Sequence, residues 1–206
     1  MAIFKPEITE STGNGNKFTG ICKFAIINFE DKSGMFDWAD LYLDIEVKQE
    51  HSDYTRKLQI KGSYEKDSSG NITGGSVLKR LYTFFDAIGC KAGINVKGEW
   101  EDEDGNKIDD IAQYLNKGAS DGDVETVSSY KYLAYFYKEQ PKKPGAKSYT
   151  TVWPKVYIST DENQSKLKND IDWLKGKGYL KELTDEVANA PAMSGDGLAN
   201  LWTMSK

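Results

Sequence analysis

Aromatic and basic side chains are concentrated in one stretch of the chain, residues 128–160, with the sequence SSYKYLAYFYKEQPKKPGAKSYTTVWPKVYIST. An aromatic ring offers a flat face on which a nucleic-acid base can stack, and a lysine offers a positive charge for a phosphate. Two aromatic segments flank a basic loop around Pro144 and Gly145. This pattern is typical of surfaces that bind single-stranded nucleic acid.

The two aromatic segments are predicted to form a β-hairpin that turns within residues 142–147. If the numbers of paired residues sum to about 287, one face carries rings and lysine and the other carries branched aliphatic side chains. The residues predicted to stack on bases are Tyr130, Tyr132, Phe136, Tyr149, Trp153 and Tyr157. The residues predicted to bind phosphates are Lys131, Lys138, Lys142, Lys143, Lys147 and Lys155. Alternatively, both faces are covered, and Trp153 and the tyrosines pack beneath a helix as core aromatics.

Charge is segregated along the chain. The 206 residues have a net charge of −5, which argues against a protein that binds duplex DNA over its whole surface. Residues 98–125 have a net charge of −8, whereas residues 128–160 have a net charge of +5. A chain with this distribution can present one basic surface while it stays acidic overall.

The elements that must position these side chains are predicted to be mainly strands. Residues 18–30, 36–50 and 54–67 are predicted strands, and apolar and polar residues alternate in the second from Leu41 to Lys48. The short connections between the three predict an antiparallel meander. Apolar residues at helical spacing predict two helices, the first capped by Ser76 and the second capped by Asp161. Between these helices, we expect a hairpin over residues 93–108 and a short helix after it.

A single domain over residues 17–180 is expected, with a flexible arm at residues 1–16 and a flexible tail at residues 181–206. No apolar stretch has the roughly 20 residues that a membrane span needs, and residues 1–10 lack the layout of a secretory signal. A cytoplasmic protein without membrane contact is therefore expected. Cys22 and Cys90 lie in apolar surroundings, which favours reduced, packed thiols.

Few residues in this sequence support catalysis. The only histidine is His51, so triads and histidine-based metal sites have too few members, and the sequence contains no phosphate-binding loop motif. The acidic run EWEDEDGNKIDD does not fit a calcium loop and is better explained by a turn at Asp104 and Gly105 with solvated carboxylates. We therefore expect no cofactor, no metal and no enzymatic activity.

The order of these parts, a β meander, the apolar helix GGSVLKRLYTFFDAIG, an acidic hairpin and an aromatic strand pair that ends in VWPKVYI, resembles the single-stranded DNA-binding proteins of tailed phages. The resemblance covers residues 17–180 and concerns layout, without an invariant motif. It implies an α+β fold, mainly β with two or three helices, in which an OB-like antiparallel barrel has a helix between strands and a C-terminal helix. It also implies sequence-tolerant binding of single-stranded DNA during replication or recombination in an infected bacterial cell.

Such proteins often recruit partners through a strongly acidic tail, and this tail is only weakly acidic. Leu198, Leu201 and Trp202 are its one apolar cluster and the candidates for docking a replication or recombination protein. Two other functions stay open. One is a protein-interaction module of a phage or host-takeover factor, and the other is a divalent-metal-dependent nucleic-acid enzyme that uses Asp102 or Asp104. The sequence leaves the oligomeric state undetermined.

Overall fold

A computed structural model describes residues 19–121, 130–141 and 147–183. The main sheet contains β1 (Gly20–Asp31), β2 (Leu41–Gln49), β3 (Thr55–Gly62), β9 (Tyr132–Lys138), β10 (Thr150–Val152) and β11 (Tyr157–Ile158). Two small sheets contain β4 (Glu65–Lys66) with β5 (Ile72–Gly74), and β6 (Gly93–Ile94) with β7 (Trp100–Glu101) and β8 (Lys107–Ile108). The helices of these residues are α1 (Ser76–Ile88), α2 (Ile111–Asp121) and α3 (Asp161–Gly176).

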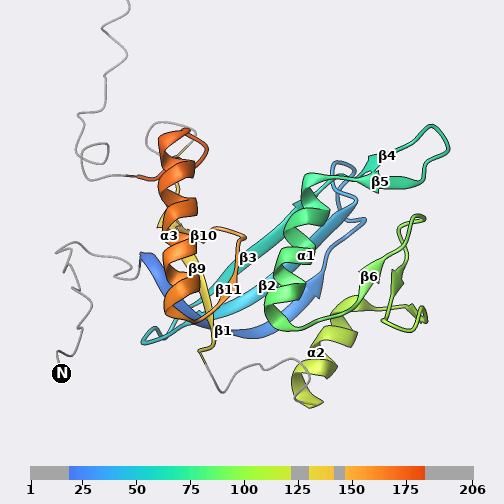
Figure 1. Cartoon of the computed structure of the whole chain (residues 1–206), viewed down its shortest axis with the longest axis horizontal. Coiled ribbons are helices and arrows are strands. Elements are labelled where there is room, and N and C mark those ends of the chain that lie inside the picture. Colours follow the sequence, from blue (N-terminus) through green and yellow to red (C-terminus); the bar gives the residue numbers. More distant parts are fainter. Residues whose placement is uncertain (1–18, 122–129, 142–146, 184–206) are drawn as a thin grey trace, which may run out of the picture.

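The main sheet curls into a nearly closed antiparallel barrel. Its strand order is β10-β9-β1-β2-β3, and β11 also pairs with β9. The two ends of this order, β3 and β10, lie beside each other, and α1 follows β3 and precedes β9 in the chain. Figure 1 shows α1 packed across one end of the strands. This is the strand order and helix position of an OB-type barrel, so the predicted fold class is confirmed.

The core forms because alternate residues of each strand point into the barrel. Leu43 and Ile45 of β2 lie opposite Ile60 and Leu58 of β3, and all four are fully buried. The helix α1 adds five buried side chains to this core: Val77, Leu81, Phe84, Phe85 and Ile88. These positions recur every three or four residues, so the apolar face of α1 closes the barrel.

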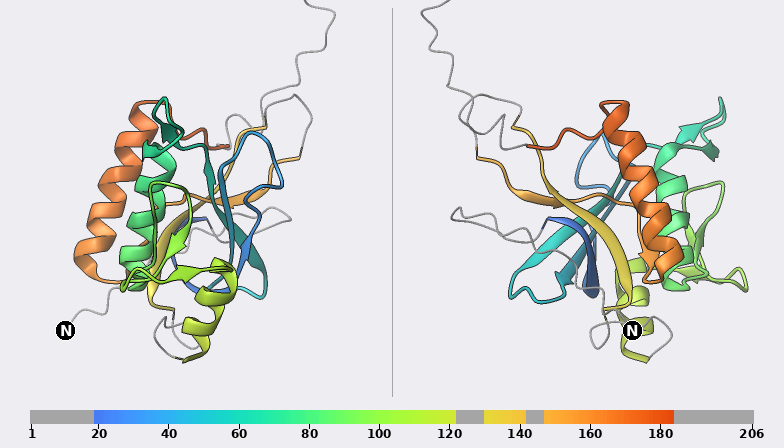
Figure 2. Two further views of the ribbon diagram at one scale, coloured as in Figure 1. Left: turned by 90° about the vertical axis from the view of Figure 1, so that its right-hand side faces the viewer. Right: turned by 60° about the vertical axis from the view of Figure 1, so that its left-hand side comes forward.

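A second, smaller core lies outside the barrel, between β9 and α3. Leu133, Tyr135 and Tyr137 of β9 pack there against Leu167 and Ile171 of α3. Figure 2 shows α3 lying across the outer side of the barrel, beside α1. Both faces of β9 are therefore covered, one by the barrel interior and one by α3.

Several element boundaries differ from the prediction. The second strand begins at Leu41, so the part of the predicted strand from Phe36 to Asp40 is a loop. The N-cap of α3 is Thr160, whose hydroxyl accepts a hydrogen bond from the Asn163 amide at 3.2 Å. The N-cap of α1 is Gly75, and Ser76 is the first helical residue. In both helices the cap lies one residue before the predicted position, because only a residue with extended or non-helical backbone can cap.

The acidic segment forms the sheet β6-β7-β8, with the predicted turn at Asp104 and Gly105. Cys22 and Cys90 are free thiols, half-buried against the barrel core, and burial raises the pKa of each. Within the described ranges of the chain, no helix combines the length and the apolarity that crossing a membrane requires.

Candidate nucleic-acid interface

The hairpin of β9 and β10 has a register one residue away from the predicted one. Thr150 pairs with Lys138 and Val152 with Phe136, so the numbers of paired residues sum to 288. A shift of one residue exchanges the two faces of a strand relative to its partner. Tyr132 and Phe136 therefore point into the barrel, where they are 4% and 0% exposed and contact the ring of Phe24. The prediction that these two rings form a free stacking surface is wrong.

The outer face of the same hairpin is covered by α3. Trp153 and Tyr157 are half-buried there, and the Tyr157 hydroxyl donates a hydrogen bond of 2.9 Å to Asp170. Lys155 forms an ion pair of 2.6 Å with the same Asp170 carboxylate. The alternative interpretation, in which Trp153 and the tyrosines pack beneath a helix, is thus confirmed for this part of the hairpin. Tyr130 is half-buried, and Tyr149, 73% exposed, presents a free ring.

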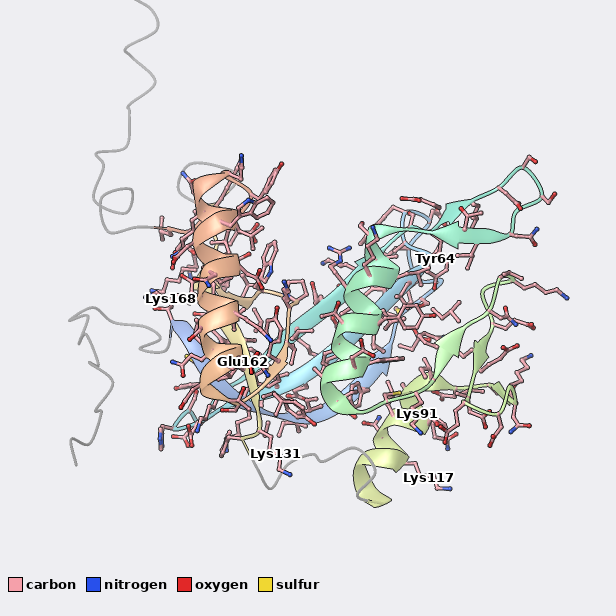
Figure 3. All side chains as sticks on the ribbon, in the orientation of Figure 1. Tyr64, Lys91, Lys117, Lys131, Glu162 and Lys168 are labelled. Carbon is pink, nitrogen blue, oxygen red and sulfur yellow. The ribbon has the colours of Figure 1, made fainter. Side chains whose placement is uncertain are left out.

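The lysines predicted to bind phosphates do not form one surface. Lys131 precedes β9 and Lys138 ends it, so about 23 Å of strand separates them. Figure 3 shows Lys131 at the lower end of the barrel. Lys142 and Lys143 lie outside the described residues, as do the tail residues Leu198, Leu201 and Trp202. Lys147 is exposed beside β10.

An exposed aromatic cluster lies instead on the outer face of β2 and β3. Phe36 and Trp38 come from the loop before β2, and their rings lie 5.4 Å and 6.0 Å from the ring of Tyr42. Lys61 of β3 places its ammonium group over the rings of Tyr42 and Trp38, at 5.1 Å and 6.0 Å. Trp38 is 53% exposed and Phe36 41% exposed. The cluster thus combines open ring faces with a cation.

The loop that carries these rings is held in place by hydrogen bonds at both ends. The Tyr42 amide donates to the Ser33 hydroxyl at 3.0 Å, and the Ser63 hydroxyl donates to the Trp38 carbonyl at 2.8 Å. Gly34 adopts φ +80° at the turn, a left-handed conformation that glycine adopts at little cost. The exposure of Phe36 and Trp38 is therefore a property of an ordered loop.

A buried carboxylate supports the cluster from below. Asp44 accepts hydrogen bonds from Lys32 Nζ at 2.6 Å and from Gln59 Nε2 at 2.8 Å. Gln59 Nε2 also donates to the Tyr42 hydroxyl at 2.9 Å, and its Oε1 accepts from Lys61. The hydrogen bonds to Asp44 and Glu30 raise the pKa of Lys32, so this lysine stays charged. The network fixes the ring of Tyr42 and orients the Lys61 ammonium group.

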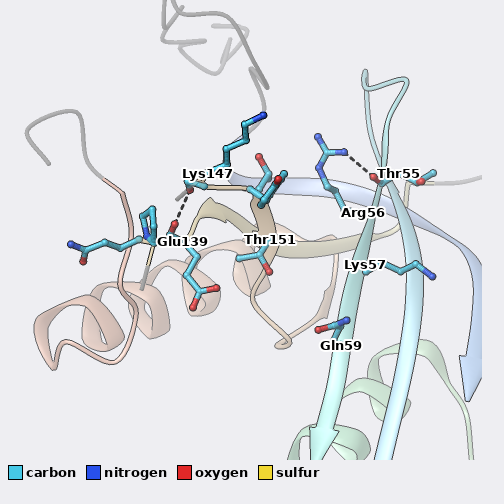
Figure 4. Close-up of a pocket in the computed structure, with 12 residues that line it drawn as sticks. Thr55, Arg56, Lys57, Gln59, Glu139, Lys147 and Thr151 are labelled. Carbon is cyan, nitrogen blue, oxygen red and sulfur yellow. Dashed lines mark hydrogen bonds between the residues drawn. The ribbon is translucent and has the colours of Figure 1, made fainter. Parts of the chain in front are cut away.

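A groove of about 540 Å³ lies between β3 and β10. Gln59 lines it and donates a hydrogen bond to the Tyr42 hydroxyl, so this side chain lies between the groove and the aromatic cluster. Figure 4 shows Arg56 of β3 and Lys147 beside β10 on the two sides of the groove. The exposed Tyr149 also lines it. Two of the predicted residues, Lys147 and Tyr149, are thus brought to the same surface as the aromatic cluster.

The acidic turn does not provide a metal site in the described residues. Asp102 Oδ1 accepts hydrogen bonds from the amides of Asp104 and Asn106, and Oδ2 accepts from the Asn106 side chain. These bonds lower the pKa of Asp102 and satisfy the carboxylate within the turn. Among the residues with described positions, no cluster of histidine, cysteine, aspartate and glutamate has the geometry to hold a metal ion.

Comparison of the chain with protein-family models, with curated proteins and with solved structures gives no significant match. One feature of the sequence indicates the aromatic cluster, although the alternation of apolar and polar residues does not reveal it. Met35, Phe36 and Trp38 lie within four residues of the end of the turn formed by Lys32 to Gly34. Three large apolar residues beside a turn are expected to remain exposed, because a short connection between strands has little core to enter.

Proposed function

We propose that this protein binds single-stranded DNA, without catalysis and with little sequence preference, on the outer face of β2 and β3. The observation that carries the proposal is the pair of exposed rings of Phe36 and Trp38, which pack on the buried ring of Tyr42 beside the Lys61 ammonium group. OB-type barrels bind oligonucleotides on the face of their second and third strands and on the adjoining loops. Bases would stack on the free faces of Trp38 and Phe36.

The groove between β3 and β10 supports the same proposal. Arg56 and Lys147 place positive charges along it, at the end of β3 opposite to Lys61. Lys57, which also lines the groove, lies on the same face of β3 as Lys61, and their four-residue separation corresponds to about 13 Å of extended strand. A single strand of DNA that lies along β3 would therefore stack its bases on the aromatic cluster at one end of β3. At the other end of β3 it would present its phosphates to the groove.

The resemblance to phage single-stranded DNA-binding proteins adds a setting to this proposal. In that setting the protein would coat single strands during DNA replication or recombination in the cytoplasm of an infected bacterium. Sequence tolerance follows from the ring faces, because every base can stack on them.

The decisive experiment is a titration of the full chain with oligo-dT, followed by fluorescence anisotropy of the labelled strand. Trp38→Ala is expected to weaken binding about 5-fold to 150-fold, the loss of one stacked base. Trp173→Ala is the matched control, because Trp173 is exposed to a similar extent (57% against 53% for Trp38) and lies on α3. This control is expected to bind oligo-dT like the unmodified protein.

The proposal would be contradicted if Trp38→Ala bound oligo-dT normally, or if both tryptophan variants lost the same affinity. A duplex of the same length is expected to bind more weakly, because its bases are not free to stack. Oligo-rU is the single-stranded RNA used for comparison. If oligo-rU bound more tightly than oligo-dT, the ligand would be single-stranded RNA and the proposal of DNA binding would be wrong.

A further inference from the structure

A second surface lies on the helical side of the molecule, in a cleft of about 240 Å³ between α1 and α3. Its walls are largely apolar and include Trp153, Pro154, Trp173 and Leu174. Figure 2 shows α1 and α3 side by side at this position. The volume of the cleft suits one large apolar side chain, and its lining is unsuited to a row of phosphates.

The rim of the cleft is positively charged. Lys79 and Arg80 of α1 line it together with Lys155 and Asp170, and these last two residues neutralise each other through their ion pair of 2.6 Å. The two cations of α1 are left in excess. The cleft therefore combines an apolar pocket with a positive rim.

Arg80 adds a second, independent observation. One of its terminal nitrogens donates to the Lys61 carbonyl at 2.9 Å, which holds the guanidinium against the barrel. Its Nε is buried, and within the described part of the chain it has no hydrogen-bond partner. A carboxylate is the acceptor that matches a guanidinium best, so the anchored Arg80 side chain is a suitable partner for an acidic ligand at the cleft.

The surface next to the cleft has the composition of a protein interface. Trp173 is 57% exposed and packs against Tyr179, itself 66% exposed, with ring centroids 5.7 Å apart. Tryptophan, tyrosine and arginine dominate the binding energy of protein interfaces, where an anchor side chain fills a pocket. These rings lie on and just after α3, outside the cluster of Phe36, Trp38 and Tyr42.

We propose that the cleft between α1 and α3 binds an acidic peptide segment of a partner protein, with one aromatic or large aliphatic side chain inserted between Trp153 and Trp173. The carboxylates that flank this anchor pair with Lys79 and Arg80. The proposal does not depend on nucleic-acid binding, because none of the residues that line the cleft belongs to the β2 and β3 face.

The test uses the full chain and a short, capped, fluorescent peptide with one central phenylalanine among glutamates. Two matched peptides replace the phenylalanine by alanine or the glutamates by lysines. The first peptide is expected to bind with a Kd below about 1 mM, and each matched peptide is expected to bind about tenfold more weakly. Equal binding of all three peptides, or no binding below about 1 mM, would overturn the proposal.

Protein variants locate the binding. Trp173→Ala and Lys79→Glu are each expected to weaken the acidic peptide about tenfold. Lys168→Glu makes the same change of charge on the side of α3 that faces away from α1, and it is expected to change affinity less than about twofold. If Lys168→Glu lowered the affinity for the acidic peptide as much as Lys79→Glu does, the loss would be explained by net charge alone, and the proposal would be overturned.

Two further measurements separate other occupants of the cleft. Trp38→Ala is expected to lose oligo-dT and keep the peptide, and Trp173→Ala the reverse, so failure of one proposal leaves the other testable. If Trp173→Ala lowers the affinity for oligo-dT and leaves the affinity for the peptide unchanged, the cleft binds nucleic acid, and the proposal of a partner protein is refuted. If the combined change Leu201→Ala and Trp202→Ala raises peptide affinity, the chain's own tail is the occupant, which also refutes it.

Discussion

At the scale of single residues, Asp44 is the buried charge on which the polar part of the β2 and β3 face depends. Its side chain is 4% exposed, although it lies on the outer face of β2. It accepts from Lys32 and Gln59, and Gln59 in turn holds the Tyr42 hydroxyl. A buried carboxylate is stable only when charged donors surround it. The position of the Tyr42 ring thus depends on a residue that touches no ligand.

Asp44→Ala is expected to lower the free energy of unfolding by about 1 to 3 kcal/mol, because it removes the buried acceptor that Lys32 and Gln59 share. Affinity for oligo-dT should fall as well, because Tyr42 loses its support. Urea denaturation and oligo-dT titration measure the two effects. Asp44→Asn keeps an acceptor for Gln59 and is expected to fall between the unmodified protein and the alanine variant. A change in unfolding free energy below about 0.5 kcal/mol would contradict this role.

The ion pair between Lys32 and Asp44 predicts how the stability of the protein depends on pH. Hydrogen bonds to Asp44 and Glu30 raise the pKa of Lys32 above its ordinary value of 10.5. A group whose pKa is raised on folding stabilises the protein fully below the unfolded pKa and loses this effect as the pH rises through the folded pKa. The stability difference between the unmodified protein and Asp44→Ala should therefore be constant near neutral pH and shrink above pH 10.5, as pH-dependent urea denaturation can show.

At the scale of elements, β9 and α3 decide which aromatic side chains are free. The even-numbered residues of β9 enter the barrel, and the odd-numbered residues meet α3. Tyr135 shows how α3 and the segment after it cover the outer face of β9. The Tyr135 hydroxyl donates to Glu182, and the Nζ atom of Lys175 lies 4.9 Å from the centroid of the Tyr135 ring. The aromatic residues of this strand are therefore structural, and α3 is required to keep their outer faces from water.

Thr160→Ala is expected to lower the free energy of unfolding by about 1 kcal/mol, because it removes the side-chain cap that satisfies the Asn163 amide. Urea denaturation followed by circular dichroism measures this loss. Ser165→Ala is the matched control within α3, where the serine hydroxyl bonds to the Asp161 carbonyl one turn earlier. This control should be neutral or slightly stabilising, because alanine is the better helix former. Equal losses for both variants would contradict the assignment of Thr160 as the cap.

At the scale of the whole molecule, the acidic sheet and the basic side chains of the groove lie apart. The acidic sheet of β6, β7 and β8 lies at one end of the long axis, and α3 with β10 lies toward the other (Figure 1). The groove with Arg56 and Lys147 borders β10. An overall acidic protein can therefore direct a polyanion to one side, because repulsion from the acidic sheet and attraction to the groove act together.

This arrangement predicts the salt dependence of oligo-dT binding. With phosphate contacts from Arg56, Lys61 and Lys147, the logarithm of the association constant should fall with the logarithm of salt concentration with a slope of about −2. Lys147→Gln should reduce the magnitude of this slope by about 0.7. Lys91→Gln, which removes the partner of Glu103 at the acidic end, should leave the slope unchanged. Titrations at several salt concentrations check this, and equal slopes for Lys147→Gln and the unmodified protein would exclude Lys147 from the contact.

The sequence by itself determined the features that depend on local periodicity. The alternation of Leu43, Ile45 and Val47 specifies a strand with one buried face, and the spacing of apolar residues in 76–88 specifies a helix, because each periodicity places apolar groups on one side. The OB-like barrel was predicted through the resemblance of this layout to phage single-stranded DNA-binding proteins. The concentration of lysine and tyrosine near residue 147 also marked one wall of the groove.

Only the tertiary structure decided which rings are free. One residue of register places Phe136 in the barrel core, and the cover of α3 buries Tyr135, yet neither the register nor the cover is encoded in the spacing of the hairpin itself. Phe36 and Trp38 are exposed because the strand begins at Leu41 and the preceding loop has no core to enter. The contact of Trp38 with Lys61 joins residues more than 20 positions apart, which local sequence cannot specify.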